Sequence, residues 1–253
     1  MSTRNADRRA TARDKLAAER ARQAAAQQRQ RRLLLVAIPL VVVVIAVAVG
    51  IVATRGSGSS SASAPRPTGV AAVGAGFTTG TAGKPVIDLW EDFQCPICKQ
   101  FEGSDSAKAM RQLAADGKAQ LVIHPLSFLD DNLGNDSSKR AAAAFGCAID
   151  AGKGLEYHDA VYAHQPEKEG AGYTDAQLLS FGTEAGITGP AYDTFQQCVK
   201  AGTYDGWAGQ VQHTMEQHGI TGTPTIQVAG KSQDLQTLSA DSITRAVTAA
   251  AGS

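Results

Sequence analysis

A pair of cysteines separated by two residues is the part of this sequence best suited to chemistry. The segment reads Cys95-Pro96-Ile97-Cys98, and its spacing marks a candidate thiol–disulfide redox centre. The reactive species in such a centre is the thiolate, which a helix N-terminus favours through its unpaired N–H groups and its dipole. We therefore expect Cys95 to be the nucleophile and Cys98, one helical turn further on, to be the buried resolving thiol.

The elements around this pair place it between a strand and a helix. Residues 85–90 form a short, largely apolar run that predicts a strand, and residues 120–124 predict a second strand that Pro125 stops. Between them, apolar residues at helical spacing predict a helix over 96–115. Cys95 then falls at or near the helix N-cap, with a proline at the first helical position, where proline is tolerated.

A second motif lies far along the chain, in the segment Gly222-Thr223-Pro224-Thr225. A glycine shortly before a proline that opens an apolar strand suits a cis peptide bond between Thr223 and Pro224. Such a bond would bring the Thr223 backbone against Cys95 and Cys98, where it can pair with an extended substrate chain. Thr223 and Pro224 are therefore expected to contribute to substrate binding.

The charges of the chain are unevenly distributed. The 253 residues include 24 Lys and Arg and 24 Asp and Glu, so the formal net charge is zero. Residues 1–32 hold ten of the basic groups and three of the acidic ones, which leaves the rest of the chain acidic. This asymmetry excludes a uniformly basic nucleic-acid binder, and the apolar content of 43% excludes disorder over the full length.

An uncharged apolar run follows the basic arm. As a helix, residues 33–53 would span roughly 31 Å, close to a bilayer core of about 30 Å. A transmembrane anchor is therefore expected. A cleaved signal peptide is the rival interpretation, although the run exceeds the usual length of its apolar region. Because the basic arm precedes the run, the positive-inside rule places residues 1–32 in the cytoplasm and the later chain outside the membrane.

Small and polar residues fill positions 54–76, a composition typical of a flexible linker. The remaining residues, 77–253, suffice for one well-cored domain. This organisation predicts a single-pass protein of the cell membrane with its N-terminus in the cytoplasm and its large domain extracytoplasmic.

The order of these elements resembles the thioredoxin fold, and more closely the DsbA-like family of extracytoplasmic thiol–disulfide oxidoreductases. Residues 90–102 and 222–225 carry the resemblance; they read Trp-Glu-Asp-Phe-Gln-Cys-Pro-Ile-Cys-Lys-Gln-Phe-Glu and Gly-Thr-Pro-Thr. The resemblance covers residues 77–253 and is greatest to the membrane-anchored Gram-positive members. It implies an α/β thioredoxin fold with a helical insert at about 133–218.

Helical patterns in the insert agree with this implication. Helices are expected at residues 138–151, 155–164, 174–185, 191–200 and 204–218, and a closing helix of the thioredoxin fold at 238–250.

The resemblance also implies a protein-disulfide oxidoreductase that needs no bound cofactor. An oxidase of this kind takes electrons from reduced secreted or membrane proteins and passes them to a membrane quinone-linked protein of the DsbB-like or VKOR-like type. A reductase or isomerase, for example in cytochrome maturation, is the alternative. Pro96 and Ile97 tune the potential; without the histidine of the strongest oxidants, a value less oxidising than about −120 mV is expected. No dimerisation segment is recognisable, so a monomer is expected.

Two further expectations follow from the resemblance. Cys147 and Cys198 fall on helices of the insert and are expected to form a structural disulfide, with two buried free thiols as the alternative. Many relatives place a buried acid six residues before the first cysteine, as a proton acceptor for the resolving thiol, but that position is Leu89 here. Glu91, which has the same strand parity, is the candidate substitute, with a surface carboxylate as the alternative.

Other classes of function fit the residues less well. Structural zinc sites use two close cysteine pairs, whereas the second pair here is widely split. The five histidines form no ligand motif, so no metal site is expected, and neither a nucleophile elbow nor a phosphate-binding glycine motif occurs. A thioredoxin-like binding module without redox activity is the remaining alternative, against which the intact cysteine pair and the Thr-Pro motif argue.

Overall fold

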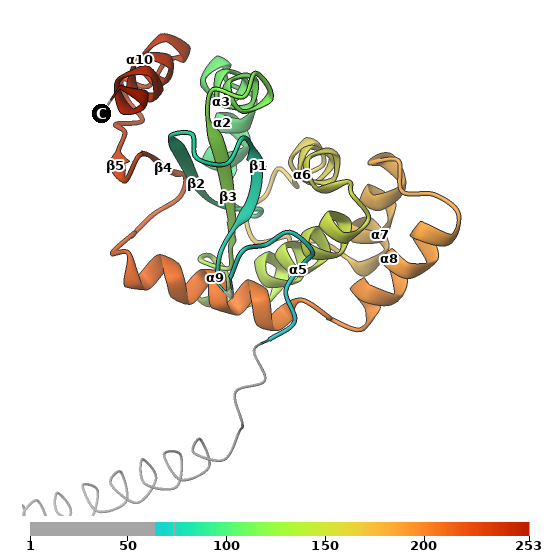
Figure 1. Ribbon diagram of the computed structural model, residues 1–253. Coiled ribbons are helices and arrows are strands. Elements are labelled where there is room, and N and C mark those ends of the chain that lie inside the picture. Colours follow the sequence, from blue (N-terminus) through green and yellow to red (C-terminus); the bar gives the residue numbers. More distant parts are fainter. Residues whose placement is uncertain (1–63, 73, 253) are drawn as a thin grey trace, which may run out of the picture. The chain divides into compact units, whose positions relative to one another are not determined.

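A computed structural model describes residues 64–72 and 74–252 of the chain (Figure 1). The predicted basic arm, the predicted anchor over 33–53 and the first part of the predicted linker lie outside these residues. Within the part of the chain that is described, no helix is both long and apolar enough to cross a membrane.

A mixed sheet of five strands in the order β1-β3-β2-β4-β5 forms the centre of the fold. Its strands are β1 (Phe77–Gly80), β2 (Val86–Asp92), β3 (Gln120–Leu126), β4 (Thr225–Val228) and β5 (Lys231–Ser232). β2 and β3 run parallel, whereas the other neighbouring pairs are antiparallel. Ile87 and Leu89 on β2 are buried on one face together with Ile123 on β3, as the alternation of side chains along a strand requires.

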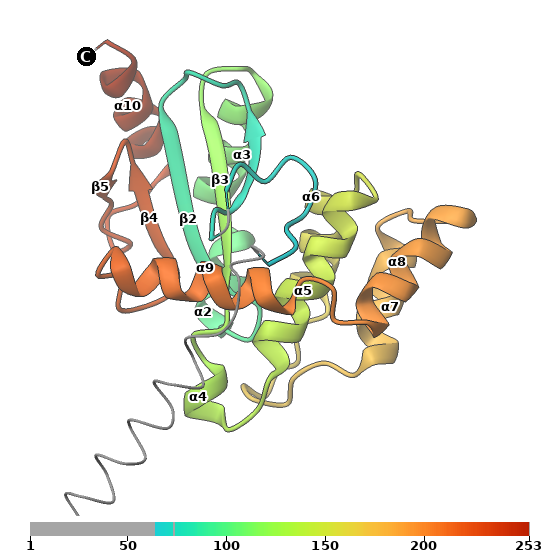
Figure 2. The same ribbon diagram turned by 60° about the horizontal axis from the view of Figure 1, so that its bottom comes forward.

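Helices cover both faces of this sheet. On one face, α3 (Asp105–Ala115) packs against α10 (Ala240–Ala251). On the other, α9 (Asp205–Gln217) crosses the strands, as Figure 2 shows, and its last turn lines a cavity with Asp88 and Trp90 of β2. The short helix α2 (Pro96–Glu102) follows β2 and precedes α3, which completes the predicted β-α-β unit.

The remaining helices form the insert between β3 and β4, beside the sheet in Figure 2. They are α4 (Asp130–Leu133), α5 (Ser137–Asp150), α6 (Gly154–Ala163), α7 (Asp175–Glu184) and α8 (Pro190–Lys200), after which α9 leads back to the sheet. Each predicted helix of the insert, and the closing helix, is confirmed to within two residues at either end. A disulfide joins Cys147 on α5 to Cys198 on α8, in place of two free thiols.

The predicted helix over 96–115 is two helices. Gly103 ends α2, and Ser104 begins α3 as an N-cap whose hydroxyl accepts a hydrogen bond from the Ala107 N–H at 3.2 Å. A serine in this position satisfies an otherwise unpaired N–H at the helix start, and it therefore favours a new helix over the continuation of the old one.

Both central strands are longer than predicted. β2 runs two residues past Trp90, and β3 continues through Pro125 to Leu126. The proline is tolerated because β1 pairs with β3 only as far as Ile123, so Pro125 lies where β3 has no β1 partner to bond.

The predicted flexible linker does not extend to residue 76. Val70 is 3% exposed, the Thr68 N–H donates to Asp150 at 2.7 Å, and Trp207 Nε1 donates to the Ala75 carbonyl at 2.9 Å. This burial and these two hydrogen bonds tie the segment to the rest of the domain despite its linker-like composition, so the folded domain begins before residue 77. Strand β1, which no sequence pattern indicates, follows directly.

Candidate active site

Cys95 and Cys98 lie at the start of α2, where β2 ends. Cys95 is the N-cap of the helix, with φ −77° and ψ 116°, and Pro96 occupies the first helical position. Both cysteines are free thiols in this structure, and Cys95 Sγ accepts a hydrogen bond from the Cys98 backbone N–H at 3.4 Å. Both residues are buried, but Cys95 keeps 5% of its surface exposed whereas Cys98 keeps none, so Cys95 is the more accessible of the two.

The Thr223–Pro224 peptide bond is cis, as its sequence context predicts. It brings the Thr223 carbonyl oxygen to 3.6 Å from Cys95 Sγ, although 128 residues separate the two along the chain. Pro224 also lines an apolar cavity of about 260 Å³ together with Ile97 and Leu235. Ile97 and Leu235 are the large apolar side chains that are exposed within residues 64–72 and 74–252, so exposed apolar groups border this cavity.

The surroundings of the two sulfurs give them opposite acidities. Hydrogen bonding from the Cys98 thiol outweighs burial and lowers the pKa of Cys95 to about 6, and bonds from the Thr223 side chain and from backbone N–H groups add to this effect. Burial raises the pKa of Cys98 well above 9, and its bond to Cys95 and the charges of Cys95 and Glu91 raise it further. At neutral pH Cys95 is therefore a thiolate and Cys98 a thiol.

Alkylation of the reduced chain by iodoacetamide is expected to follow these acidities. The rate at Cys95 should rise with pH around a midpoint near 6, because the thiolate is the reactive form. Cys98, buried and protonated, should stay unmodified. Timed quenching and mass spectrometry of digests measure both sites, with glutathione as the unperturbed control. A Cys95 midpoint at about 8.5, the value of an ordinary thiol, would contradict this description.

Side chains of the helical insert hold the loop that carries Cys95. Each of them donates a hydrogen bond to a backbone carbonyl between residues 92 and 95. The bonds run from Tyr162 to Asp92 (3.2 Å), from Tyr173 to Phe93 (2.6 Å), and from Gln165 to Phe93 (2.7 Å) and Cys95 (3.0 Å). The insert therefore fixes the backbone that presents the nucleophile.

The carboxylate of Asp92 connects the same loop to the start of α5. It accepts hydrogen bonds from Ser138 Oγ (2.6 Å) and from the N–H groups of Gln94 (2.8 Å) and Leu129 (2.9 Å). Burial nevertheless raises the pKa of Asp92 to about 7 from the ordinary value of 3.8. Because the folded-state pKa is the higher one, the contribution of Asp92 to stability is full below pH 3.8 and is lost as pH rises through about 7.

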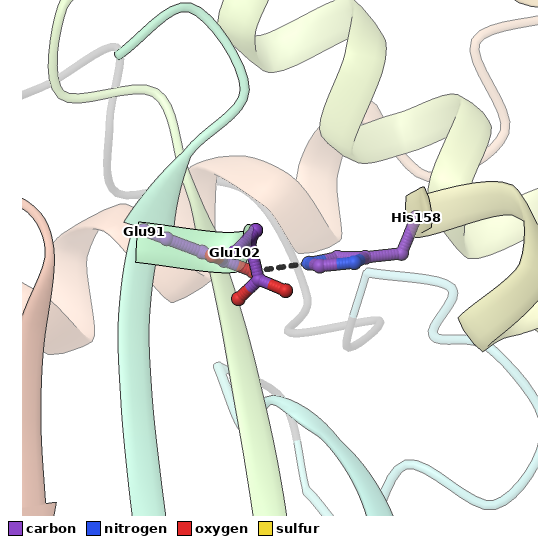
Figure 3. Close-up of side chains that lie close together, drawn as sticks. All are labelled: Glu91, Glu102 and His158. Carbon is purple, nitrogen blue, oxygen red and sulfur yellow. Dashed lines mark hydrogen bonds and ion pairs between the residues drawn. The ribbon is translucent and has the colours of Figure 1, made fainter. Parts of the chain in front are cut away.

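Glu91, Glu102 and His158 lie close together in a cluster (Figure 3), in which Glu91 and His158 are buried and Glu102 is partly buried. Glu91 comes from β2, Glu102 from the end of α2 and His158 from α6. Glu91 and His158 point toward each other and are joined by a short hydrogen bond between Oε1 and Nε2. Glu91 is 1% exposed, so the alternative of a surface carboxylate is wrong.

The burial of Glu91 follows from the length of its strand. Because β2 runs on to Asp92, Glu91 shares the inward face of the strand with Ile87 and Leu89. Leu89 packs in the apolar core, whereas Glu91 brings a carboxylate close enough to Cys98 for its charge to raise the pKa of that thiol.

Arg111 completes the cluster as its counter-ion. Its guanidinium donates to Glu102 at 2.5 Å and to Asp159 at 2.6 Å, and it lies 3.1 Å from Nδ1 of His158. Glu91, Glu102 and His158 each offer one ligand atom within 4.8 Å of the others, which is a geometry that a metal ion can use. The guanidinium already provides a positive charge at Glu102, so we interpret the cluster as an ion-pair network.

The structure gathers most of the predicted site residues in one place. Those that it brings together are Cys95, Pro96, Ile97, Cys98, Thr223, Pro224 and Glu91. Cys147 and Cys198 lie apart from them, in the insert. No motif indicates His158; its one sequence signal is a helical face shared with the apolar Val161 and Tyr162, where a buried polar group needs a partner.

Comparisons with known proteins agree with this geometry. Residues 75–248 match the family described as thioredoxin. No protein in the curated set matches the chain. Among solved structures, the thiol-disulfide oxidoreductase MdbA of Actinomyces oris is 24% identical with a TM-score of 0.61, over 75% of this chain and 94% of that one.

Two other similar structures are DsbA of Mycobacterium tuberculosis and BdbD of Bacillus subtilis. The first is 22% identical with a TM-score of 0.58, over 70% of this chain and 93% of that one. The second is 18% identical with a TM-score of 0.61, over 75% of this chain and 98% of that one. At these identities the likeness shows the fold. The chain therefore belongs to the thioredoxin family, and it has the fold of the DsbA-type thiol-disulfide oxidoreductases that are its structural neighbours.

Proposed function

We propose that this chain is an extracytoplasmic dithiol oxidase that introduces disulfides into reduced secreted or membrane proteins. The observation that carries the proposal is the contrast between the two sulfurs, an accessible Cys95 with a lowered pKa and a buried Cys98 with a raised one. A thiol of low pKa is a good leaving group in exchange, so a mixed disulfide to Cys95 resolves readily in favour of an oxidised substrate.

The reaction begins with the oxidised pair. A substrate thiolate attacks Cys95 Sγ, the Cys95–Cys98 bond breaks, and Cys98 leaves and takes up a proton. A second substrate thiolate then attacks the substrate sulfur of the mixed disulfide and expels Cys95 as a thiolate. The substrate has lost two electrons, which the Cys95–Cys98 pair has gained as a reduced dithiol.

The cavity beside Cys95 supports a protein substrate. Thr223 lies next to Cys95 Sγ and can pair with an extended chain, while Ile97, Pro224 and Leu235 offer apolar contacts. The substrate thus lies across the start of α2, with its cysteine at Cys95.

The proposed location and partners rest on the sequence. The basic arm, the apolar run over 33–53 and the acidic remainder support a single membrane span with the domain outside. An oxidase there needs a membrane partner that takes up electrons, for which a quinone-linked protein of the DsbB-like or VKOR-like type is proposed. We propose that the chain acts as a monomer.

The exchange in the opposite direction is the second candidate function. The exposed Ile97 takes the place of a polar or charged neighbour beside the Cys95 thiolate, which favours a less oxidising pair and hence a reductase or isomerase.

The potential of the pair decides between the two directions. The full-length chain is equilibrated with mixtures of reduced and oxidised glutathione, and the fraction of Cys95–Cys98 disulfide is measured by alkylation and mass spectrometry. We expect a potential clearly above that of thioredoxin, together with rapid oxidation of an added reduced, unfolded substrate protein by the oxidised chain. A potential near about −270 mV would contradict the oxidase and favour the reductase.

A further inference from the structure

The buried side chain of His158 has a carboxylate near each of its ring nitrogens, and the guanidinium of Arg111 lies 3.1 Å from Nδ1. Nε2 is bonded to Glu91, whose side chain is 1% exposed, and Nδ1 lies 3.4 Å from Oδ1 of Asp159, whose side chain is 57% exposed. The imidazole therefore connects a buried carboxylate with one at the surface. An imidazole can take up a proton at one nitrogen while it releases another from the second, which suits a proton shuttle.

Cys98 needs a path of this kind. Its pKa well above 9 keeps the thiol protonated, yet the thiol must lose its proton before it can attack Cys95 Sγ. Cys98 is fully buried, so surface water does not reach its sulfur directly. Oε2 of Glu91 is buried without a hydrogen-bond partner, and it is therefore available to accept this proton.

We propose that Glu91, His158 and Asp159 form a proton path between Cys98 and solvent, with His158 as its central relay. The inference rests on the proposed thiol–disulfide function and deepens it. It gives His158 a part in the reaction through Glu91, since its hydrogen-bonding neighbours are Glu91, Asp159 and Arg111 and none of them is a sulfur.

The path operates when the pair is reoxidised. The Cys95 thiolate has by then attacked a disulfide of the oxidising partner and formed a mixed disulfide. Cys98 gives its proton to Oε2 of Glu91, and its thiolate attacks Cys95 Sγ. The mixed disulfide breaks, the Cys95–Cys98 bond forms, and the partner sulfur leaves as a thiolate, so two electrons pass to the partner.

The proton then continues outward. As the proton from Cys98 arrives on Oε2 of Glu91, the proton in the hydrogen bond between Oε1 and Nε2 lies on Nε2. Nδ1 of His158, which also lies 3.1 Å from the Arg111 guanidinium, releases its own proton to Asp159, which passes it to water. When a substrate reduces the pair again, Cys98 takes up a proton by the same steps in reverse, and the path returns to its starting state.

The surroundings of His158 favour its protonated form. Burial alone would lower the pKa of His158, but the charge of Glu91 and the bonds to Asp159 and Glu91 raise it to about 10. The titratable groups that face His158 or Glu91 are Glu102 and Cys98 on α2, Arg111 on α3, Asp159 and Tyr162 on α6, and His124 on β3.

The path is tested by the lifetime of a mixed disulfide between Cys95 and glutathione. The reduced full-length chain is mixed with oxidised glutathione at several pH values from about 6 to 9, and the adduct is followed by acid quenching and mass spectrometry. His158→Gln keeps a hydrogen bond to Glu91 but cannot titrate, so its adduct should last about 10²-fold longer. Its resolution rate should rise about tenfold per pH unit, because hydroxide must remove the Cys98 proton, whereas the wild-type rate should vary little.

Asp159→Asn tests the outer end of the path without disturbing the core, and it should lengthen the adduct lifetime at least about threefold and steepen the pH profile. A matched control should keep the wild-type lifetime and profile. Asp175→Asn removes another exposed aspartate that is paired with an arginine, Arg140.

Equal lifetimes and equal pH profiles in wild type, His158→Gln and Asp159→Asn overturn the proposal. A longer lifetime with an unchanged pH profile in His158→Gln also overturns it, because a loss of packing alone would act in this way. If His158→Gln does not fold, Asp159→Asn decides by the same two measurements. A wild-type chain whose Cys95–Cys98 pair is not converted to the disulfide by oxidised glutathione contradicts the proposed function itself, and the path with it.

Discussion

Replacing Cys98 by serine is expected to trap the chain in a covalent complex with a disulfide-bearing partner, whereas replacing Cys95 abolishes exchange. In Cys98→Ser the Cys95 thiolate still attacks a disulfide, but no second thiol is present to resolve the product. In Cys95→Ser the accessible nucleophile is gone, and the fully buried Cys98 cannot take its place. Oxidative folding of a reduced substrate should therefore fall at least about 10³-fold in both variants.

Non-reducing electrophoresis and mass spectrometry distinguish the two variants. The Cys98→Ser complex should be linked through Cys95, and dithiothreitol should release the partner by reducing this disulfide. Cys95→Ser should form no such complex. Cys95→Ala serves as the control for the serine hydroxyl and should behave like Cys95→Ser. Equal rates of oxidative folding by wild type and Cys95→Ser would remove Cys95 as the nucleophile.

Removal of the disulfide between Cys147 and Cys198 is expected to lower the free energy of unfolding by about 4 kcal/mol. The bond closes a loop with a sequence separation of 51, and in the chain-entropy model a loop of this length strongly restricts the unfolded chain. It also joins α5 to α8, so the loss should appear as unfolding of the insert. Chemical denaturation followed by circular dichroism measures the difference.

This comparison is best made in a Cys95→Ala, Cys98→Ala background, where one disulfide remains. There, dithiothreitol should reproduce the effect of Cys147→Ala with Cys198→Ala, and it should have no further effect on that variant. A difference below about 1 kcal/mol would show that the bond contributes little to the stability of the folded chain.

The sequence was sufficient for the parts of the site that local patterns determine. The C-x-x-C at a strand–helix junction, the cis bond before Pro224 and the helices of the insert all depend on residues close together in the chain. Capping, proline geometry and helical periodicity are properties of such short segments, which is why they could be predicted.

Among the buried charges, Glu91 could be named as a candidate from strand parity, but its partners could not be predicted in the same way. Glu91 and His158 are 67 residues apart and meet because α6 packs near β2, and Arg111 reaches the cluster from a third element. A single charged residue in a sequence gives no sign of the partner that allows its burial, so a surface position is its natural interpretation. The end of β2 was predicted two residues too early for a similar reason, because its pairing with β3, a distant segment, extends the strand past Trp90.

The contacts between the insert and the loop at residues 92–95 have a consequence for cooperativity. Tyr162, Gln165 and Tyr173 hold the carbonyls of this loop, and the Asp92 carboxylate holds the start of α5 in return. Loosening of the insert would release the backbone of the nucleophile, and loosening of the loop would leave polar groups of the insert unpaired. The two segments, distant in sequence, thus form one unit of local unfolding. Exposure of the backbone at residues 92–95 therefore requires the helical insert to open. The Cys95 sulfur can react without this opening, because it lies on the outer side of the loop.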